Sequence, residues 1–94
     1  MSNRLIKTDP RKIGLSPRSE ILSNAKLQYY IVKDRKSRII MKDGHQILHQ
    51  ANIIRRRIPG VVITLATSAP VCRKTEAFLG KNGINILSLA DLLA

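Results

Sequence analysis

Residues 61–87 read VVITLATSAPVCRKTEAFLGKNGINIL, and this stretch decides the fold. The β-branched, apolar run 61–65 is typical of a central strand that is buried on both faces. Pro70 begins a predicted helix that ends near Gly83, and residues 84–87 predict another strand. A strand, a helix and a strand over this length predict a right-handed parallel crossover. The residues expected on the inner face of the helix are Val71, Cys72, Ala77 and Phe78.

The clearest helix pattern lies upstream, in residues 45–58, HQILHQANIIRRRI. Its apolar residues recur at i, i+4, i+7 and i+11, which is the spacing of one helix face. They are Ile47, Ala51, Ile54 and Ile58. Pro59 and Gly60 follow directly and end the helix.

The remaining elements are predicted from shorter patterns. Ser16 and Pro17 favour a helix start, so a short helix is expected to Asn24, with Ile21, Leu22 and Ala25 facing inward. Residues 26–33 and 38–42 predict two strands, joined by a polar turn over 34–37 into an antiparallel hairpin. Residues 88–94 predict a short terminal helix.

Together these elements predict an α/β fold for the chain. We expect a small single domain with about four mixed strands, flanking helices and a parallel C-terminal β-α-β unit. The length of 94 residues is that of one domain. Residues 1–15 show no helical or strand period and are expected to form a flexible basic N-terminal arm. Residues 16–94 are then the α/β domain.

Positive charge is the feature that points to a partner. The chain has 17 Lys and Arg against 6 Asp and Glu, a formal net charge of +11. Residues 1–59 carry 14 of the basic and 4 of the acidic residues, so they hold +10 of that charge. Such an excess is larger than the magnitude of about 2–8 that keeps a small domain soluble. It favours a polyanionic partner, of which nucleic acid is the first choice and a membrane surface the last.

Several classes are disfavoured by composition alone. No apolar run has the roughly 18 residues of a transmembrane helix, and no apolar stretch follows the first basic residues as in a secretory signal. Cys72 is the single cysteine, which excludes an intramolecular disulfide. We therefore expect a cytoplasmic, intracellular protein, associated with the chromosome or nucleoid if the partner is DNA.

Basic and amide side chains form the candidate interface. His, Asn and Arg donate hydrogen bonds to phosphates and base edges, and residues 45–57 place them along one helix. The N-terminal arm and the expected hairpin add further cations. The nucleic-acid-binding candidates are Arg4, Lys7, Arg11, Lys12, Arg18, Lys33, Arg35, Lys36, Arg38, Lys42, His49, Asn52, Arg55, Arg56 and Arg57.

Two patterns leave an enzyme open as the alternative. Asp34, Arg35 and Lys36 spell an acid-x-Lys element, and with Glu20 they give a minimal Mg²⁺ nuclease its nominal parts. Residues 67–72 place hydroxyls and a cysteine before a helix, where anions are favoured. His45 and His49 have a metal-compatible spacing, but the third ligand of a zinc site is missing. We expect no catalytic residue, metal or cofactor.

Residues 59–94, PGVVITLATSAPVCRKTEAFLGKNGINILSLADLLA, resemble the last β-α-β-α of Mrr-type, restriction-endonuclease-like domains. This resemblance covers about a third of the chain and rests on the order of elements. It implies that catalytic residues lie earlier in the chain, where residues 20–42 do not supply them in the right places. A catalytically inactive relative is therefore implied. The same segment is similar to the β-α-β unit of a group of small ribosomal proteins, and residues 45–58 resemble a helix of Alba-type chromatin proteins.

The sequence thus predicts a small basic protein that binds nucleic acid through its phosphate backbone without catalysis. Duplex DNA is slightly favoured over RNA because stacking aromatic residues are scarce. A homodimer is expected, since one small domain offers few phosphate contacts. The alternatives are a minimal or degenerate Mg²⁺-dependent nuclease and a basic adaptor for an acidic protein.

Overall fold

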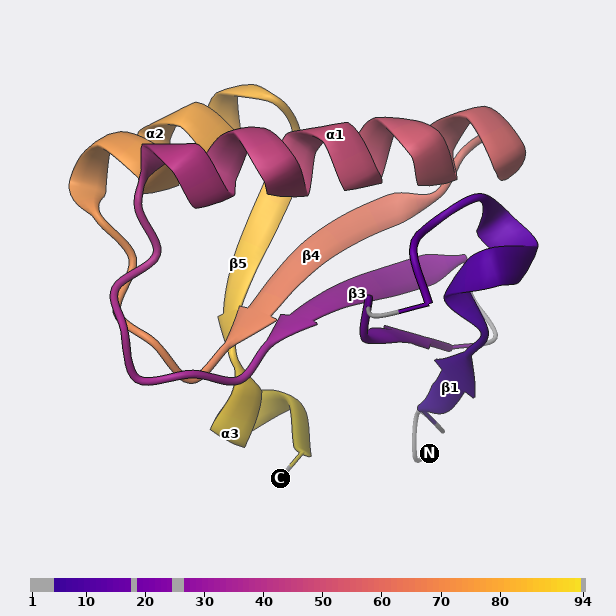
Figure 1. Cartoon of the computed structure of the whole chain (residues 1–94), viewed down its shortest axis with the longest axis horizontal. Helices are drawn as coiled ribbons and strands as arrows, with labels where there is room; N and C mark the ends of the chain where they lie inside the picture. Colours follow the sequence, from indigo (N-terminus) through magenta and orange to yellow (C-terminus); the bar gives the residue numbers. More distant parts are fainter. Residues whose placement is uncertain (1–4, 18, 25–26, 94) are drawn as a thin grey trace.

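A computed structural model describes residues 5–17, 19–24 and 27–93 (Figure 1). Within them, five strands form one mixed sheet in the order β1-β2-β3-β4-β5. The first three strands pair antiparallel, whereas β3, β4 and β5 pair parallel. The strands are β1 Ile6–Thr8, β2 Ile21–Ser23, β3 Gln28–Lys33, β4 Val62–Thr67 and β5 Ile84–Ser88.

Helices cover the two faces of the sheet unequally. The helical segments are the 3₁₀ helix η1 Pro10–Ile13, α1 Met41–Arg57, α2 Arg73–Lys81 and α3 Leu89–Leu93. Helices α1 and α2 lie over one face, and the short α3 lies at the other (Figure 1). The α/β fold, the single mixed sheet and the parallel β4-α2-β5 unit confirm the predicted fold class. Among the described residues, no helix has the length and apolar character needed to cross a membrane.

Strand β4 lies in the interior of the sheet, between β3 and β5. Ile63 and Leu65 are fully buried in the larger core cluster, between the sheet and α1. Ala66 points the other way, into a smaller cluster with Val32 and Leu89. Because neighbouring side chains of a strand alternate between faces, burial of every residue from Ile63 to Thr67 means that both faces of β4 are covered there. The predicted buried interior strand is confirmed from Ile63 onward, whereas Val62 is exposed.

Helix α1 begins at Met41, four residues before the expected start, and the predicted strand over 38–42 is wrong. Only Ile39 makes a β contact there, a single parallel bridge to Val71. The Asp43 carboxylate accepts a hydrogen bond from the Ile40 backbone N–H at 2.9 Å, which favours a helix start at this point. The antiparallel hairpin is absent because β3 pairs parallel with β4, and α1 is the crossover between them.

The N-terminal third differs most from expectation. The segment 1–15, expected to lack regular structure, contains β1 and η1, and Ile13 and Leu15 lie in the main core. The expected helix over 16–24 is also wrong, because Ile21–Ser23 forms β2 against the edge of β3. A strand of three residues is too short to show the alternation of apolar and polar residues that predicts a strand. It becomes a strand because its backbone pairs with the edge of β3. The expected inward position of Ala25 lies outside the described residues.

Helix α2 packs closely against α1 at a glycine. A Cβ atom at Gly44 would lie 3.0 Å from the Thr75 methyl group, so any larger residue here would require Thr75 to shift. Thr75 and Leu79 are the buried residues of α2, and Phe78 packs at the edge of the core. Ala77 is exposed, so its predicted inward position is wrong. Gly83, with φ of 75°, follows the helix in the left-handed conformation that its predicted role requires.

Candidate nucleic-acid interface

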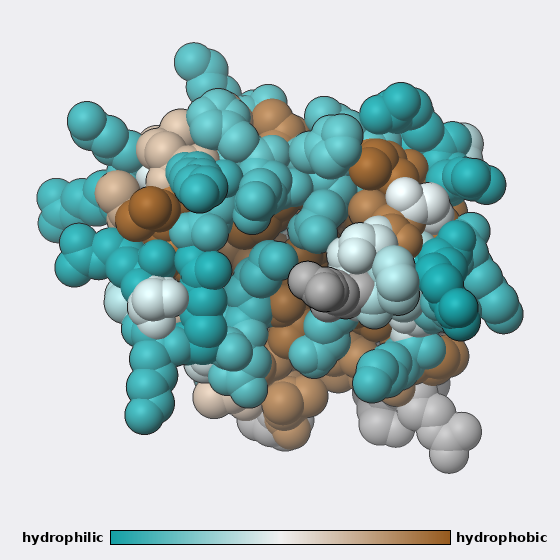
Figure 2. All heavy atoms as spheres, in the orientation of Figure 1, coloured by the Kyte–Doolittle hydropathy of each residue, from teal (hydrophilic) through white to brown (hydrophobic). Residues whose placement is uncertain are grey.

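The solvent-exposed side of α1 carries a row of polar side chains. We call this row the α1 stripe; it consists of Lys42, His45, His49, Asn52 and Arg56, all exposed. Their spacing of three or four residues places them on one helix face, because that spacing corresponds to about one turn. At about 1.5 Å per residue the stripe is roughly 21 Å long. Figure 2, in the orientation of Figure 1, shows hydrophilic side chains projecting over the α1 and α2 layer.

No carboxylate interrupts the α1 stripe. The one acidic residue of α1 is Asp43, whose carboxylate lies 2.6 Å from the Arg35 guanidinium. Burial opposes ionisation of Asp43, but the hydrogen bond from Ile40 and the guanidinium of Arg35 together hold its pKa below the ordinary value. The charge of Asp43 is therefore compensated within the protein, and the stripe presents only cations and neutral polar groups.

Helix η1 adds cations beside the C-terminal end of α1. Arg11 and Lys12 are exposed, and a Cβ atom at the following Gly14 would lie 3.7 Å from the guanidinium of Arg57. Asp9 caps η1 and pairs with Arg11 at 3.3 Å, and this side-chain contact lowers the pKa of Asp9. Arg57 and Lys12 thus extend the positive surface from α1 onto the N-terminal segment.

Arg35 and Arg55, both predicted binding residues, are engaged with backbone carbonyls. Besides its ion pair, Arg35 donates hydrogen bonds to the backbone carbonyls of Ser37 and Arg38, both at 3.3 Å. Arg55 is half-buried and donates to the backbone carbonyl of Asn82 at 2.9 Å. Both arginines therefore hold loops in place, and the sequence contains no local pattern that separates them from their exposed neighbours.

The other predicted residues do not join the stripe. Lys7 is opposite Leu22 in the β1–β2 register, and Leu22 packs in the cluster on the α3 side of the sheet. Paired residues share a face, so Lys7 lies on the side away from α1. Lys36 and Arg38 are exposed in the loop between β3 and α1. Arg4 and Arg18 lie outside the described residues.

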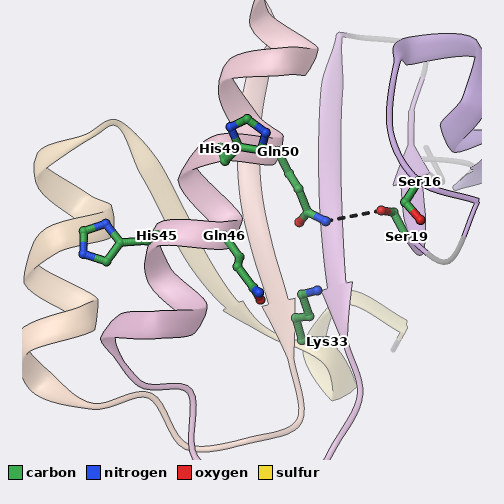
Figure 3. A pocket seen from close by; sticks show the side chains of 7 residues that line it. All are labelled: Ser16, Ser19, Lys33, His45, Gln46, His49 and Gln50. Carbon is green, nitrogen blue, oxygen red and sulfur yellow. Dashed lines mark hydrogen bonds between the residues drawn. The ribbon is translucent and has the colours of Figure 1, made fainter.

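A pocket of about 750 Å³ adjoins the α1 stripe. It lies between α1, the end of β3 and the loop before β2 (Figure 3). None of the described residues that line it is acidic. They are Ser16, Ser19, Lys33, His45, Gln46, His49 and Gln50. Lys33 was predicted as a phosphate contact, whereas Ser19 has no local sequence pattern that marks it and joins the pocket only through the fold.

Lys33 is the charged group of the pocket. Partial burial lowers its pKa below 10.5, and the nearby positive charge of Arg35 lowers it further, whereas the Asp43 carboxylate opposes this shift. Among the described residues, its ammonium has neither a hydrogen-bond partner nor a carboxylate within ion-pair distance. A half-buried cation of this kind favours an anion in the pocket.

The hydroxyls before α2 are used within the protein. Thr67 Oγ1 donates to the Lys33 carbonyl at 2.7 Å, and the Ser68 hydroxyl donates to the Asp34 carboxylate at 2.7 Å. Cys72 is half-buried at the start of α2, where the backbone N–H groups of Thr75 and Lys74 lower the pKa of its thiol. The hydrogen bonds of Thr67 and Ser68 join the ends of β3 and β4. These structural roles account for the two hydroxyls without a bound anion.

The acidic residues considered for a nuclease, Glu20 and Asp34, are both exposed. Asp34 is exposed and bonded to Ser68, Lys36 is exposed in the same loop, and Glu20 is exposed ahead of β2. Across the described ranges, no three His, Cys, Asp or Glu side chains are grouped as a metal site.

Comparisons of the chain with protein-family models, with curated proteins and with solved structures found no match. The resemblance to restriction-endonuclease-like domains therefore stays a prediction. The case for function rests on the geometry of the α1 stripe and the pocket beside it.

Proposed function

We propose that this protein binds nucleic acid through phosphate contacts and catalyses no reaction. The α1 stripe carries the proposal, because it is an exposed row without a free carboxylate, about 21 Å long by the helical rise. Cations next to it, on η1 and at Arg57, enlarge the positive surface. Phosphate contacts of this kind supply most of the affinity for nucleic acid and need no fixed base sequence.

Duplex DNA is the preferred polymer in this proposal. Single-strand binders stack successive bases on exposed aromatic rings. Here Tyr29 and Tyr30 are half-buried and pack against opposite core clusters. The ring of Phe78 lies 4.7 Å from the His45 ring, so it too is engaged within the protein. The homodimer and the cytoplasmic location remain predictions with this function.

The test is binding to labelled duplex DNA, single-stranded DNA and RNA between about 50 and 200 mM salt. Each phosphate contact contributes about −0.9 to the slope of log affinity against log salt on a duplex. Arg56→Gln removes one exposed cation of the stripe and is expected to reduce the slope by about 0.9. Lys7→Gln is the matched control, since it removes one exposed cation from the other side of the sheet.

Three results contradict the proposal. One is the absence of binding at the lowest salt, and another is an equal loss in the Arg56→Gln and Lys7→Gln variants. The third is cleavage of the DNA in the presence of Mg²⁺, if the Asp34→Ala variant no longer cleaves. That result would support the nuclease alternative in place of the proposed function. If no polymer binds, an acidic protein partner becomes the leading alternative.

A further inference from the structure

The pocket beside the α1 stripe has a defined arrangement of polar groups. In Figure 3 the side chains of Gln46 and Gln50 extend from α1 toward β3, where the Lys33 side chain ends. Ser19 faces them from the loop before β2, and the His45 ring points away toward α2. His45 and His49 also belong to the stripe, so the pocket opens beside the surface proposed to hold the phosphate backbone.

The side-chain amide of Gln50 has a hydrogen-bond partner at its nitrogen but not at its oxygen among the described residues. Its Nε2 donates to Ser19 Oγ at 3.2 Å, while its Oε1 is buried and has no hydrogen-bond partner in the described part of the chain. A buried carbonyl oxygen without a donor is destabilising. A ligand donor relieves this once the Gln50 side chain turns its Oε1 toward the pocket, because the atom is buried as it stands.

Lys33 and Gln50 therefore favour a ligand that has both an anionic group and a hydrogen-bond donor. The half-buried ammonium of Lys33 forms no ion pair among the described residues, and the nearby Asp43 carboxylate is paired with Arg35. The buried Oε1 of Gln50 lacks a donor. The phosphodiester of a nucleic-acid strand has acceptor oxygens for Lys33 but no donor for Gln50. A nucleotide has a phosphate and a base edge with N–H groups, and a pocket of about 750 Å³ is within the range of small-molecule sites.

We propose that this pocket takes a single unpaired nucleotide of the bound nucleic acid, with its phosphate on Lys33 and its base edge on Gln50. The inference rests on the proposed function and adds the form of substrate that it prefers. A strand end, a bulge or a nucleotide turned out of the duplex can enter the pocket while the flanking phosphates lie along the α1 stripe. Extruding a paired base costs free energy because its pairing and stacking are lost, so a site with an already unpaired nucleotide is preferred.

The direct test is calorimetry, in which the 94-residue chain is titrated with nucleoside 5′-monophosphates and, separately, with inorganic phosphate. The monophosphates are expected to bind at least about tenfold more tightly than phosphate, since only they satisfy Gln50. Lys33→Met is expected to weaken monophosphate binding by about tenfold or more, because charge-assisted hydrogen bonds are the strong ones. Gln50→Leu is expected to reduce monophosphate affinity to that of phosphate.

Arg56→Gln is the control, because Arg56 belongs to the stripe and does not line this pocket. It is expected to leave monophosphate binding unchanged while it weakens binding to duplex DNA. Circular dichroism and thermal unfolding confirm that each variant is folded.

The outcomes separate the two proposals. Equal affinity for phosphate and the monophosphates, or unchanged binding in Lys33→Met, overturns the nucleotide pocket. If monophosphates do not bind but duplex DNA binds in an Arg56-dependent way, the pocket proposal is wrong and the proposed function stands. If neither ligand binds, both proposals are wrong.

Discussion

The guanidinium of Arg35 lies 2.6 Å from the carboxylate of Asp43, and this ion pair joins the loop after β3 to the first turn of α1. Both side chains are partly shielded, with 34% and 17% of their surfaces exposed. Asp43 also accepts the Ile40 backbone N–H, so one carboxylate both starts the helix and fixes the loop before it. The α1 stripe and the pocket depend on this start.

Asp43→Asn is expected to destabilise the protein by about 1–2 kcal/mol at pH 7, because it weakens a helix cap and removes an ion pair. The folded state lowers the pKa of Asp43 below 3.8, so its contribution is present above that pH. It is lost as the pH falls through the folded-state pKa. The difference in unfolding free energy between the wild type and Asp43→Asn therefore shrinks in acid, which urea titrations at several pH values measure.

Glu20→Gln is the control for the loss of an acidic residue. Glu20 is exposed and has no ion pair or hydrogen bond from its side chain in the described ranges. An equal loss of stability in the two variants would show that the Arg35–Asp43 contact contributes nothing specific.

Lys33→Met is expected to stabilise the free protein by about 0.5–1 kcal/mol at pH 7, although it weakens nucleotide binding. The folded state lowers the pKa of Lys33 below 10.5, so the unfolded chain binds that proton more tightly. The resulting penalty is full at neutral pH and declines as the pH rises through the folded-state pKa. Lys36→Met, at an exposed loop position, is expected to give no such gain.

Leu15→Ala is expected to destabilise the protein by about 2–4 kcal/mol, as in other buried leucine positions. Leu15 is 6% exposed and belongs to the main core, whereas Ile6 in β1 is 56% exposed. Ile6→Ala is therefore expected to cost less than about 1 kcal/mol. Thermal unfolding of the two variants measures whether the N-terminal segment is part of the folded domain. If both variants lose less than about 1 kcal/mol of stability, residues 1–15 form a separate arm and not a part of the folded domain.

Gly44→Ala is expected to destabilise the protein, although alanine is the better helix former by about 1 kcal/mol. The new methyl group would lie 3.0 Å from Thr75, and overpacking of this kind costs about 1–3 kcal/mol. Gly80→Ala is the matched control in α2, where no atom lies within 4 Å of the new Cβ. It is expected to stabilise by up to about 1 kcal/mol. A gain in both variants, measured by urea unfolding, would contradict the close α1–α2 packing.

The elements that were predicted well are those with a long local pattern. Helix α1 and strand β4 extend over 17 and 6 residues, and their apolar periods are visible without any partner. Strands β1 and β2 have three residues each, and their identity comes from the backbone groups of a neighbouring strand. The prediction of an antiparallel hairpin was wrong for a related reason. The residues of a local turn do not show that β3 pairs parallel with β4, which follows α1 in the chain.

The sequence by itself determined the net charge, its concentration in residues 1–59, and the polar face of α1, because composition and helical period are local properties. Only the tertiary structure decided which cations are available. Folding pairs Arg35 with Asp43 of the next helix and Arg55 with the distant Asn82. It also places Lys33 in one pocket with Gln50, where Lys33 has no ion pair among the described residues. Burial and pairing depend on neighbours that the chain brings together only on folding, and this is why the pocket could not be predicted from the order of residues.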